Sequence, residues 1–522
     1  PTDPNRHPDA MDSKINDITI VGGGDAGLLT GLCLRELNPD TDISVVDNFQ
    51  ENQTDIGKST FQAIVPILHD FLGIDGERFV KEVKPIFKAS VYFRDWCGYR
   101  RFHHPFDIYE VTPNGPAEDL LEQYYYLYDT VYTDPEFRTH NEEMAETGKT
   151  PYHFADGGRI EEYPHYAYHL NTDRFNGLLR SLCEDRGVAL VNDIVTDAAV
   201  DGNEITELHG ENDTYTADLY VDASGFNRVL KGAFDGEFRD FDLPLDAAFN
   251  VQVDRPLSEV VPATVIETGD FGWFWHIDTF DNRDLGYVYA SEYVDDEAAA
   301  AEFVEHCGGA VAREELTKYE FTSGYFADAW EGNCVAIGNA EGFVEPLQST
   351  GLTANAQAAQ VLSVLLADNG RVNHAGLREK YNAYVRNAWE SIYDFISVHY
   401  RYSEGDTPFW EDMQSIEISP RVEFIIEEFD TNGETVAESF DFQPLQHNPD
   451  TDDLVFFPVG SFHSIMRKMG ATSEFYETRE FDVSRSHKHE VNQYYQSVER
   501  EVEEFLTVEE YYKGLVDVDG VV

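Results

Sequence analysis

Basic residues are scarce in this chain of 522 residues, which has 37 Lys and Arg against 99 Asp and Glu, a formal net charge of −62. This imbalance excludes electrostatic binding of nucleic acid, because no basic surface could displace the counterions of phosphates. Apolar residues still make up 42% of the chain, enough to bury a large core. The acid must therefore cover a folded surface. Such a composition is typical of adaptation to molar salt, where the Debye length falls to about 3 Å.

Long apolar runs and ordered cysteine patterns are also missing. No run of 18 apolar residues occurs, so the sequence predicts no membrane span. Residues 1–13 are polar and rich in proline, and we expect a flexible tail there without a signal region. The five cysteines are scattered and odd in number, which predicts neither disulfides nor a metal site. We expect a reduced, cytoplasmic protein with no metal.

Apolar runs between turn residues predict an α/β fold. Residues 17–21 and 43–47 read as strands on either side of a helix over 28–37, which is a βαβ start. Alternating aromatic residues over 245–295 predict an antiparallel sheet. The same patterns predict further strands at 86–93, 189–192, 218–225 and 334–339, and helices at 171–186, 351–367, 376–402 and 492–506.

The turn after the first strand reads Gly22-x-Gly24-x-x-Gly27. In such a turn the first glycine permits the tight bend, the second lets a pyrophosphate approach, and the third lets helix pack on strand. The helix N-terminus then faces the phosphates. Asp47 ends the next strand, where it could bind ribose hydroxyls. The pattern favours a dinucleotide site over a glycine turn without a ligand.

Nucleotide-fold strands return late in the chain, which favours FAD over a nicotinamide cofactor. We expect a discontinuous FAD-binding domain from residues 14–80, 155–235 and 325–370. A mixed or antiparallel substrate-side sheet domain, 81–154 and 236–324, is inserted in it, and residues 371–522 form a mainly helical C-terminal region. Gly338 and Asn339 are expected near the ribityl phosphate region of the flavin.

Two other segments stand out. Residues 342–351, GFVEPLQSTG, precede an apolar helix that Ser349 or Thr350 can cap. The free amides at its start could bind a halide or the pyrimidine end of a flavin, although an ordinary capped helix is the alternative. In GWFWHI, Trp273 and Trp275 share one strand face. Sheet core is the simpler interpretation of that pair, and a substrate pocket is the other.

The order of these motifs resembles the flavin-dependent tryptophan halogenase family, within the FAD monooxygenase superfamily. The most specific matching segments are 330–351 and 399–410, and the chain is similar to a haloarchaeal-type member. The resemblance spans residues 15 to 412, and the final residues carry no match. Weaker matching segments are 21–30, 57–60, 70–74, 86–96, 218–226 and 272–277.

The resemblance implies that reduced FAD, oxygen and a halide give hypohalous acid. Lys88 would relay this oxidant to an electron-rich aromatic substrate such as an indole, phenol or pyrrole. A separate flavin reductase would supply the reduced FAD, because the chain has no second nucleotide fingerprint. Chloride or bromide is the expected halide.

Lys88 can also be interpreted from its position in the 86–93 strand, on one face with Ser90 and Tyr92. A buried ammonium has a lowered pKa and can hydrogen-bond hypohalous acid or form a haloamine. The alternative is a solvated lysine on an edge strand. His103, His104 and Phe106 follow and could line the substrate pocket, or form a packed aromatic turn.

Three positions depart from the family pattern. Gln348 stands where the pattern has the glutamate across the active site from the lysine, so the charge that would stabilise a ring cation is lost. Lys58 replaces an acid near the flavin, and Asp278 replaces the proline after Ile277. These departures leave open a flavin monooxygenase that has lost halogenation, or a non-catalytic flavin-binding protein.

The expected site falls into four groups. Lys88 and Gln348 are the catalytic candidates, and Ser349, Thr350 and Gly351 are the halide candidates. The substrate pocket is assigned to His103, His104, Phe106, Trp273 and Trp275. FAD is assigned to Gly22, Gly24, Ala26, Gly27, Asp47, Gly338, Asn339, Pro346 and Gly351. A small aromatic substrate, a flavin reductase and a second copy in a homodimer are the expected partners.

Overall fold

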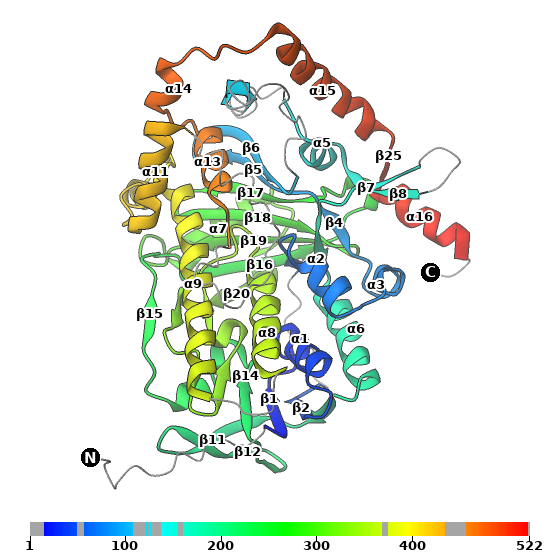
Figure 1. Ribbon diagram of the computed structural model, residues 1–522, viewed down its shortest axis with the longest axis vertical. Coiled ribbons are helices and arrows are strands. Elements are labelled where there is room, and N and C mark those ends of the chain that lie inside the picture. The colour runs from blue at the N-terminus through cyan, green and yellow to red at the C-terminus, as the bar shows by residue number, and fades with distance from the viewer. Residues whose placement is uncertain are drawn as a thin grey trace.

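A computed structural model describes residues 15–49, 57–107, 122–123, 125–127, 129, 137–154, 160–367, 374–433 and 456–519. The tail expected at 1–13 lies outside these residues. The architecture is α/β, as predicted, with two large sheets stacked along the long axis and helices beside them (Figure 1). Within the described ranges, no helix is long and apolar enough to cross a membrane.

A six-stranded sheet collects strands from four distant parts of the chain. Its neighbours pair in parallel except for the β22–β23 edge, which is antiparallel. Helix α1 (Asp25–Leu37) packs on α6 (Thr172–Asp185) and α8 (Gly351–Ala367). The strand order is β10 (Ala189–Asn192), β2 (Asp42–Asp47), β1 (Asp17–Val21), β14 (Leu219–Asp222), β23 (Cys334–Ala336) and β22 (Trp330–Glu331).

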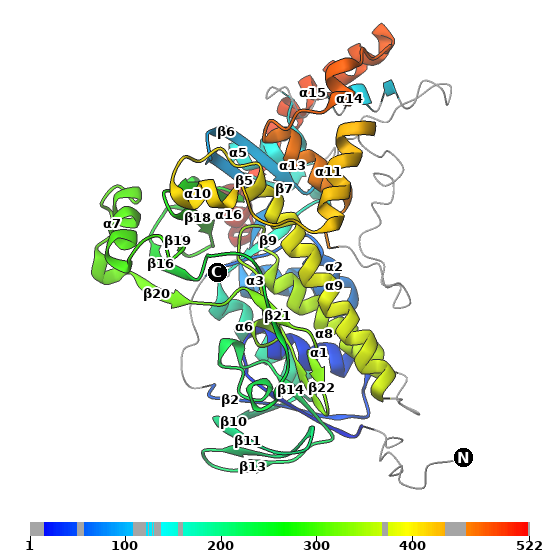
Figure 2. The same cartoon turned by 90° about the vertical axis from the view of Figure 1, so that its left-hand side faces the viewer.

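A seven-stranded sheet forms the other half, and it is antiparallel except for the β17–β5 pair. Helix α7 (Asp296–His306) stands on its outer side, away from α8 and α9 (His374–Arg401) (Figure 2). The strand order is β20 (Thr317–Glu320), β16 (Ala247–Val253), β19 (Arg283–Tyr289), β18 (Gly272–Asp278), β17 (Ala263–Gly269), β5 (Ser90–Trp96) and β6 (Tyr99–Pro105).

Smaller sheets connect the two large ones and the C-terminal helices. They are β3 (Lys58–Ser59), β9 (Ala167–Leu170) and β4 (Ile86–Lys88); β11 (Val195–Asp201), β12 (Glu204–Gly210) and β13 (Thr214–Tyr215); β15 (Phe238–Asp240), β21 (Gly324–Phe326) and β24 (Gly342–Phe343); and β25 (Phe505–Thr507), β7 (Lys149–Phe154) and β8 (Ile160–Glu162). The other helices are α2 (Ile64–Pro66), α3 (Gly76–Val83), α5 (His140–Thr147), α10 (Pro408–Met413), α11 (Pro420–Asn432), α13 (Val459–Lys468), α14 (Glu474–Thr478), α15 (Arg485–Glu503) and α16 (Val508–Asp519), with a π-helical turn at Ile67–Phe71.

One predicted strand is divided in the structure. Residues 86–93 belong to two strands in different sheets, β4 and β5, and the chain changes sheet at Ala89. The amide of Ala89 donates to the carbonyl of Pro262, and its carbonyl accepts from the amide of Phe106. The prediction of one strand was therefore wrong, and Lys88 is the last residue of β4.

Most sulfur-containing side chains of the described residues are withdrawn from solvent. All five cysteines are unpaired, and four are buried: Cys33, Cys97, Cys183 and Cys334. Burial raises the pKa of the thiols of Cys97 and Cys183 to about 12. The methionines of the described residues are buried as well, at Met144, Met413, Met466 and Met469.

Candidate active site

The Gly22–Gly27 turn has the geometry of a dinucleotide-binding fingerprint. Gly22 has φ +111°, and a Cβ there would lie 2.2 Å from the carbonyl oxygen of Ala223. A Cβ on Gly27 would lie 1.9 Å from the carbonyl oxygen of Gly22, so helix α1 packs directly on its own entry turn. Gly24 is the residue before the helix, whose first amides stay free for a phosphate. The turn fits the pyrophosphate of FAD.

Charged side chains surround this turn. The Asp47 carboxylate accepts from the amide of Gly23 at 2.7 Å, so the acid also fixes the glycine loop. Lys58 forms an ion pair with Asp25, the first residue of α1, with 3.2 Å between Nζ and Oδ2. The cation that departs from the family pattern is therefore compensated by an acid of the fingerprint itself, a partner that the motif spacing does not reveal.

The late segment 338–351 lies against the same turn. Gly338 has φ +72°, and a Cβ there would lie 2.9 Å from the Cβ of Ala26. The backbone of Ser349 has φ +59°, and the amide of Ser349 completes a turn by donating to the carbonyl of Pro346. Helix α8 then begins at Gly351, where an added Cβ would meet nothing within 4 Å. This open space beside free helix amides fits an anion or the edge of a flavin.

A chain of hydroxyl groups leads away from Ser349. Its hydroxyl lies 3.4 Å from that of Thr264, which lies 2.6 Å from the hydroxyl of Ser59. Thr264 also contacts Nε2 of His169 at 3.0 Å. Burial, with a contribution from the Lys88 charge, lowers the pKa of His169 to about 3, so this imidazole is neutral. The chain thus connects the start of α8 with the surroundings of Lys88.

The ammonium of Lys88 is fully buried. It donates to the carbonyl of Thr60 at 3.0 Å and lies 5.2 Å from the ring centre of Phe106. Burial lowers the pKa of Lys88 well below its ordinary value. The interpretation as a solvated edge lysine was therefore wrong. Within the part of the chain that the structure describes, this amine makes one hydrogen bond and has an aromatic neighbour, so its other hydrogens can be donated to a ligand.

Gln348 lies between two imidazoles. Its Oε1 accepts from Nδ1 of His104 at 2.9 Å, and its Nε2 donates to Nε2 of His399 at 2.8 Å. The tautomers follow from one outer contact, because Nδ1 of His399 must donate to the carbonyl of Phe395 and its Nε2 therefore accepts from Gln348. Oε1 of Gln348 then accepts from Nδ1 of His104, which leaves Nε2 of His104 to accept from the hydroxyl of Ser461. Burial lowers the pKa of His104 to about 4 and that of His399 to about 3.

The two neighbouring histidines point to opposite faces of β6. His104 lies on the face of β6 that contacts Gln348, and its ring centre is 6.2 Å from that of Phe61. The ring of Phe61 also packs on Phe106. His103 stacks on Tyr92 with 4.1 Å between ring centres and accepts or donates a hydrogen bond at Ser90. The structure therefore groups His104 and Phe106 with Lys88 and separates His103 from them.

Trp273 and Trp275 share one face of β18, as alternation predicts. Trp273 is fully buried and donates to Glu345 and Tyr400, at 3.3 and 3.1 Å. Trp275 donates to Asp284 at 2.9 Å. Both rings belong to the main core, which agrees with the simpler interpretation of the pair as sheet core. Burial raises the pKa of Glu345 to about 8, although the hydrogen bonds that its carboxylate accepts from Tyr400 and Trp273 act to lower it.

Asp278 lies on the other face of β18. Its carboxylate pairs with Arg255 at 3.1 Å and with Arg283 at 2.7 Å, and accepts the amide of Val261 at 2.7 Å. Burial opposes its ionisation, but the bonds from Arg283 keep the pKa of Asp278 below its ordinary value. This departure from the family pattern is therefore a buried ion cluster turned away from the tryptophans.

A surface groove of about 610 Å³ is lined by residues such as Phe226, Arg228 and Lys318. Its lining includes neither the glycine turn nor Lys88 nor Ser349 among the described residues. The groups suited to the chemistry, Lys88, Gln348 and the start of α8, therefore lie outside this open groove.

Known proteins are similar to most of the chain in sequence and in fold. The tryptophan halogenase family model matches residues 17–479, beyond residue 412 where the motifs ended. The 7-chloro-L-tryptophan 6-halogenase KtzR of Kutzneria sp. (strain 744) is 29% identical over 440 residues, which cover 76% of this chain and 82% of the relative. The tryptophan 7-halogenase RebH of Lentzea aerocolonigenes is 28% identical over 429 residues, covering 77% and 79%.

A solved structure agrees with these relatives. MibH, a lathipeptide tryptophan 5-halogenase, has a TM-score of 0.79 at 25% identity, and the match covers 98% of this chain and 94% of that one. The chain therefore belongs to the tryptophan halogenase family and is an FAD-dependent oxidoreductase of that type.

Proposed function

We propose that this enzyme halogenates an electron-rich aromatic substrate at Lys88. The observation that carries this proposal is the enclosed ammonium of Lys88, which has its carbonyl partner in Thr60 and the ring of Phe106 beside it. A lysine with a lowered pKa can donate to hypohalous acid or form a haloamine. The neighbouring aromatic side chains, together with His104, would line the substrate pocket.

The glycine turn and the start of α8 would hold the flavin and the halide. Gly22, Gly24, Ala26, Gly27 and Asp47 would bind the dinucleotide, and the 338–351 segment would face the flavin ring. Ser349, Thr350 and Gly351 would bind the halide through the free amides of α8. When bound, reduced FAD supplies the electrons with which oxygen and halide become hypohalous acid. A separate flavin reductase delivers it.

Gln348 supports a substrate more reactive than tryptophan. An amide keeps an acceptor oxygen but has no charge to stabilise a cationic ring intermediate. Its two imidazole partners, His104 and His399, also bind an amide better than a carboxylate, because Nε2 of His399 is an acceptor in this arrangement. Phenols and pyrroles, which need less activation, are the substrates that this environment favours, with electron-rich indoles next.

The competing functions lose part of their support. Lys58, Asp278 and Gln348 are the departures from the pattern that would favour a monooxygenase. Lys58, however, pairs with Asp25, and Asp278 faces away from the tryptophans. Only Gln348 remains in favour of a monooxygenase. The third expectation, a non-catalytic flavin-binding protein, is not favoured by the family to which the chain belongs, and the same assay separates all three.

We propose that the enzyme works in a salt-rich, reducing cytoplasm, where chloride and bromide are abundant. The acidic composition and the unpaired cysteines support this location. A homodimer stays a prediction that light scattering in molar salt can test.

The decisive assay combines the protein in molar salt with a flavin reductase, FAD, NADH, oxygen and bromide. A panel of phenols, pyrroles and indoles is analysed by mass spectrometry. We expect a product with the bromine isotope doublet, abolished in Lys88→Ala and kept in Lys81→Ala, a change at an exposed lysine paired with Glu77. Products that gain only oxygen would support the monooxygenase, and oxygen uptake equal to that of free reduced FAD would support the binding protein.

A further inference from the structure

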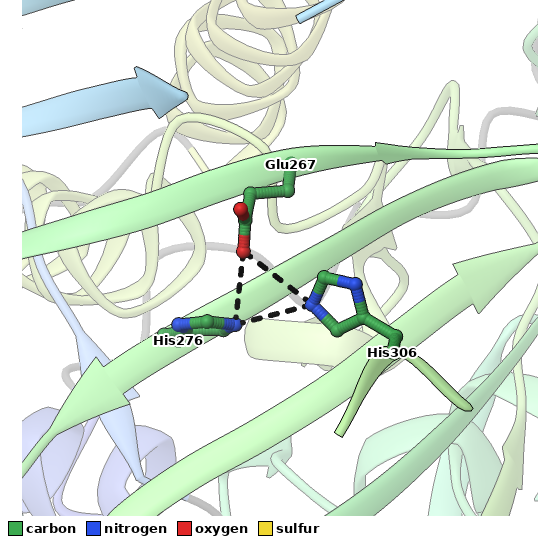
Figure 3. A group of neighbouring side chains, drawn as sticks. All are labelled: Glu267, His276 and His306. Atoms are coloured by element: carbon green, nitrogen blue, oxygen red, sulfur yellow. Dashed lines mark hydrogen bonds and ion pairs between the residues drawn. The ribbon is translucent and has the colours of Figure 1, made fainter. Parts of the chain in front are cut away.

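Three potential metal ligands converge on the outer side of the seven-stranded sheet (Figure 3). Glu267 comes from β17, His276 from β18 and His306 from the end of α7. Their side chains are partly exposed, at 16%, 19% and 22%. His276 alternates with Trp273 and Trp275 along β18, so this cluster lies on the face opposite to those rings.

The three atoms that face one another form a nearly equilateral triangle. Oε2 of Glu267 lies 3.2 Å from Nε2 of His276 and 3.4 Å from Nε2 of His306, and the two nitrogens are 3.3 Å apart. Zinc binds imidazole nitrogen and carboxylate oxygen at about 2.0–2.2 Å, so two ligands of a tetrahedral site are about 3.3–3.5 Å apart. Two edges of the triangle, at 3.3 and 3.4 Å, have this length, and the third is 3.2 Å.

No assignment of protons to the two imidazoles gives a favourable hydrogen bond along all three edges of the triangle. If both Nε2 atoms carry a proton, two N–H groups of His276 and His306 face each other. If either lacks the proton, its lone pair faces the lone pairs of the Glu267 carboxylate. A cation at the centre accepts all three lone pairs at once, which is why neutral imidazole and carboxylate are common metal ligands.

Surrounding residues hold the three side chains in place. The ring of His306 stacks on Phe274 with 3.8 Å between centres and 8° between planes. Both oxygens of Glu267 accept from Arg94, at 2.9 Å each, which is the outer-shell support typical of a ligating carboxylate. The Arg94 charge opposes a cation, whereas the net charge of −62 and the nearby Glu302 attract one.

We propose that Glu267, His276 and His306 bind a divalent transition-metal ion, Zn²⁺ in the first place, with water as the fourth ligand. Two imidazoles and one carboxylate are a ligand set that suits zinc and neighbouring transition metals rather than Ca²⁺ or Mg²⁺. The ion joins α7 to the β17–β18 hairpin and stabilises the sheet that carries the tryptophans. Local spacing gives no sign of this site, because His306 is distant in sequence, and we therefore replace the expectation of no metal.

The test is metal binding by the full chain after chelator treatment and desalting into molar potassium chloride. Calorimetric titration with Zn²⁺ is expected to show one equivalent bound, and Co²⁺ to give the visible absorption of a tetrahedral complex. His306→Phe keeps the ring stacked on Phe274 but removes the ligand, and His276→Gln removes the second imidazole. Each is expected to weaken Zn²⁺ binding by at least about 10-fold.

The matched control is His209→Ala on β12, an imidazole 3.0 Å from Glu207 and 3.9 Å from Asp197. It should bind Zn²⁺ as the unchanged protein does, and saturating Zn²⁺ should raise the Tm of both but not of the two ligand variants. Circular dichroism and the bromination assay described above serve to check that the variants fold. Less than one bound equivalent in the unchanged protein, or unaltered binding in His306→Phe and His276→Gln, would overturn the proposal.

Discussion

Nε2 of Gln348 donates a hydrogen bond to Nε2 of His399 over 2.8 Å, deep in the core. The direction is set by the other nitrogen of His399, which donates to the carbonyl of Phe395 one turn earlier in α9. The two imidazoles therefore favour an amide over a carboxylate at position 348, because this side chain must accept from His104 and donate to His399.

Gln348→Glu is expected to destabilise the protein by about 1–3 kcal/mol near pH 8, because a carboxylate would face the acceptor nitrogen of His399. Burial raises the pKa of the new acid, so the cost is absent below the unfolded value of about 4.3, grows between that value and the folded pKa, and is constant above the folded pKa. Chemical denaturation between pH 4 and 8 measures it. Gln493→Glu, on an exposed face of α15, controls for the added charge, and a cost independent of pH would contradict the argument.

Lys88→Met is expected to raise the free energy of unfolding by about 1 kcal/mol or more at pH 7, while abolishing halogenation. Burial lowers the pKa of Lys88, so between its folded pKa and about 10.4 the unfolded chain binds more protons. The stability of the unchanged protein therefore rises with pH, and the advantage of methionine shrinks. Denaturation at pH 7 and pH 10 tests this, with the exposed Lys81→Met as control. A loss of stability at pH 7 would contradict it.

Gly351→Ala is expected to raise the KM for bromide and the Kd for reduced FAD several-fold while leaving the Tm nearly unchanged. Outside its chain neighbours and its own helix backbone, a Cβ at Gly351 meets no atom within 4 Å, so any effect on the KM or the Kd must come from the ligands that enter this space. Gly177→Ala in α6 is the matched control, since its Cβ also meets nothing. That control should gain about 0.5–1 kcal/mol of stability with unchanged kinetics. Equal kinetics in both variants would place the ligands elsewhere.

Lys58→Glu is expected to weaken FAD binding by about 2–5-fold at low salt, because two carboxylates would then meet at the start of α1. The partly exposed Lys58–Asp25 pair is screened by ions, so the effect should diminish in molar salt. Fluorescence titration of FAD at both salt concentrations measures it. The double variant Asp25→Asn, Lys58→Glu should recover part of the affinity, and an effect that grows with salt would contradict this account.

The part of the site that the sequence predicts is the part that the spacing of neighbouring residues determines. Gly22, Gly24 and Gly27 indicate the turn and its helix from steric needs alone, and Ser349 and Gly351 mark the start of α8. The helix over 171–186 was also predicted closely, since Asn171 caps α6 as its side chain suggests. The family resemblance added Lys88, whose burial no periodicity could establish.

The remaining features depend on contacts between distant residues. The break at Ala89 follows from its hydrogen bonds to Pro262 and Phe106, which a strand pattern does not contain. Alternation alone separates His103 from His104, but which of them faces Lys88 is decided by the sheet that β6 joins. The pairing of Lys58 with Asp25 likewise needs the fold, because the two residues lie on separate elements.

The buried sulfur atoms have a consequence for the lifetime of the catalyst. Hypohalous acid attacks thiolates and thioethers before most other protein groups, and reaction requires both access and, for cysteine, ionisation. Four buried thiols, of which Cys97 and Cys183 have a pKa near 12, offer neither. Cys307 is the most accessible of the five, and burial raises its pKa to about 11. In the proposed reaction, the fold would therefore protect the enzyme against self-inactivation by hypohalous acid.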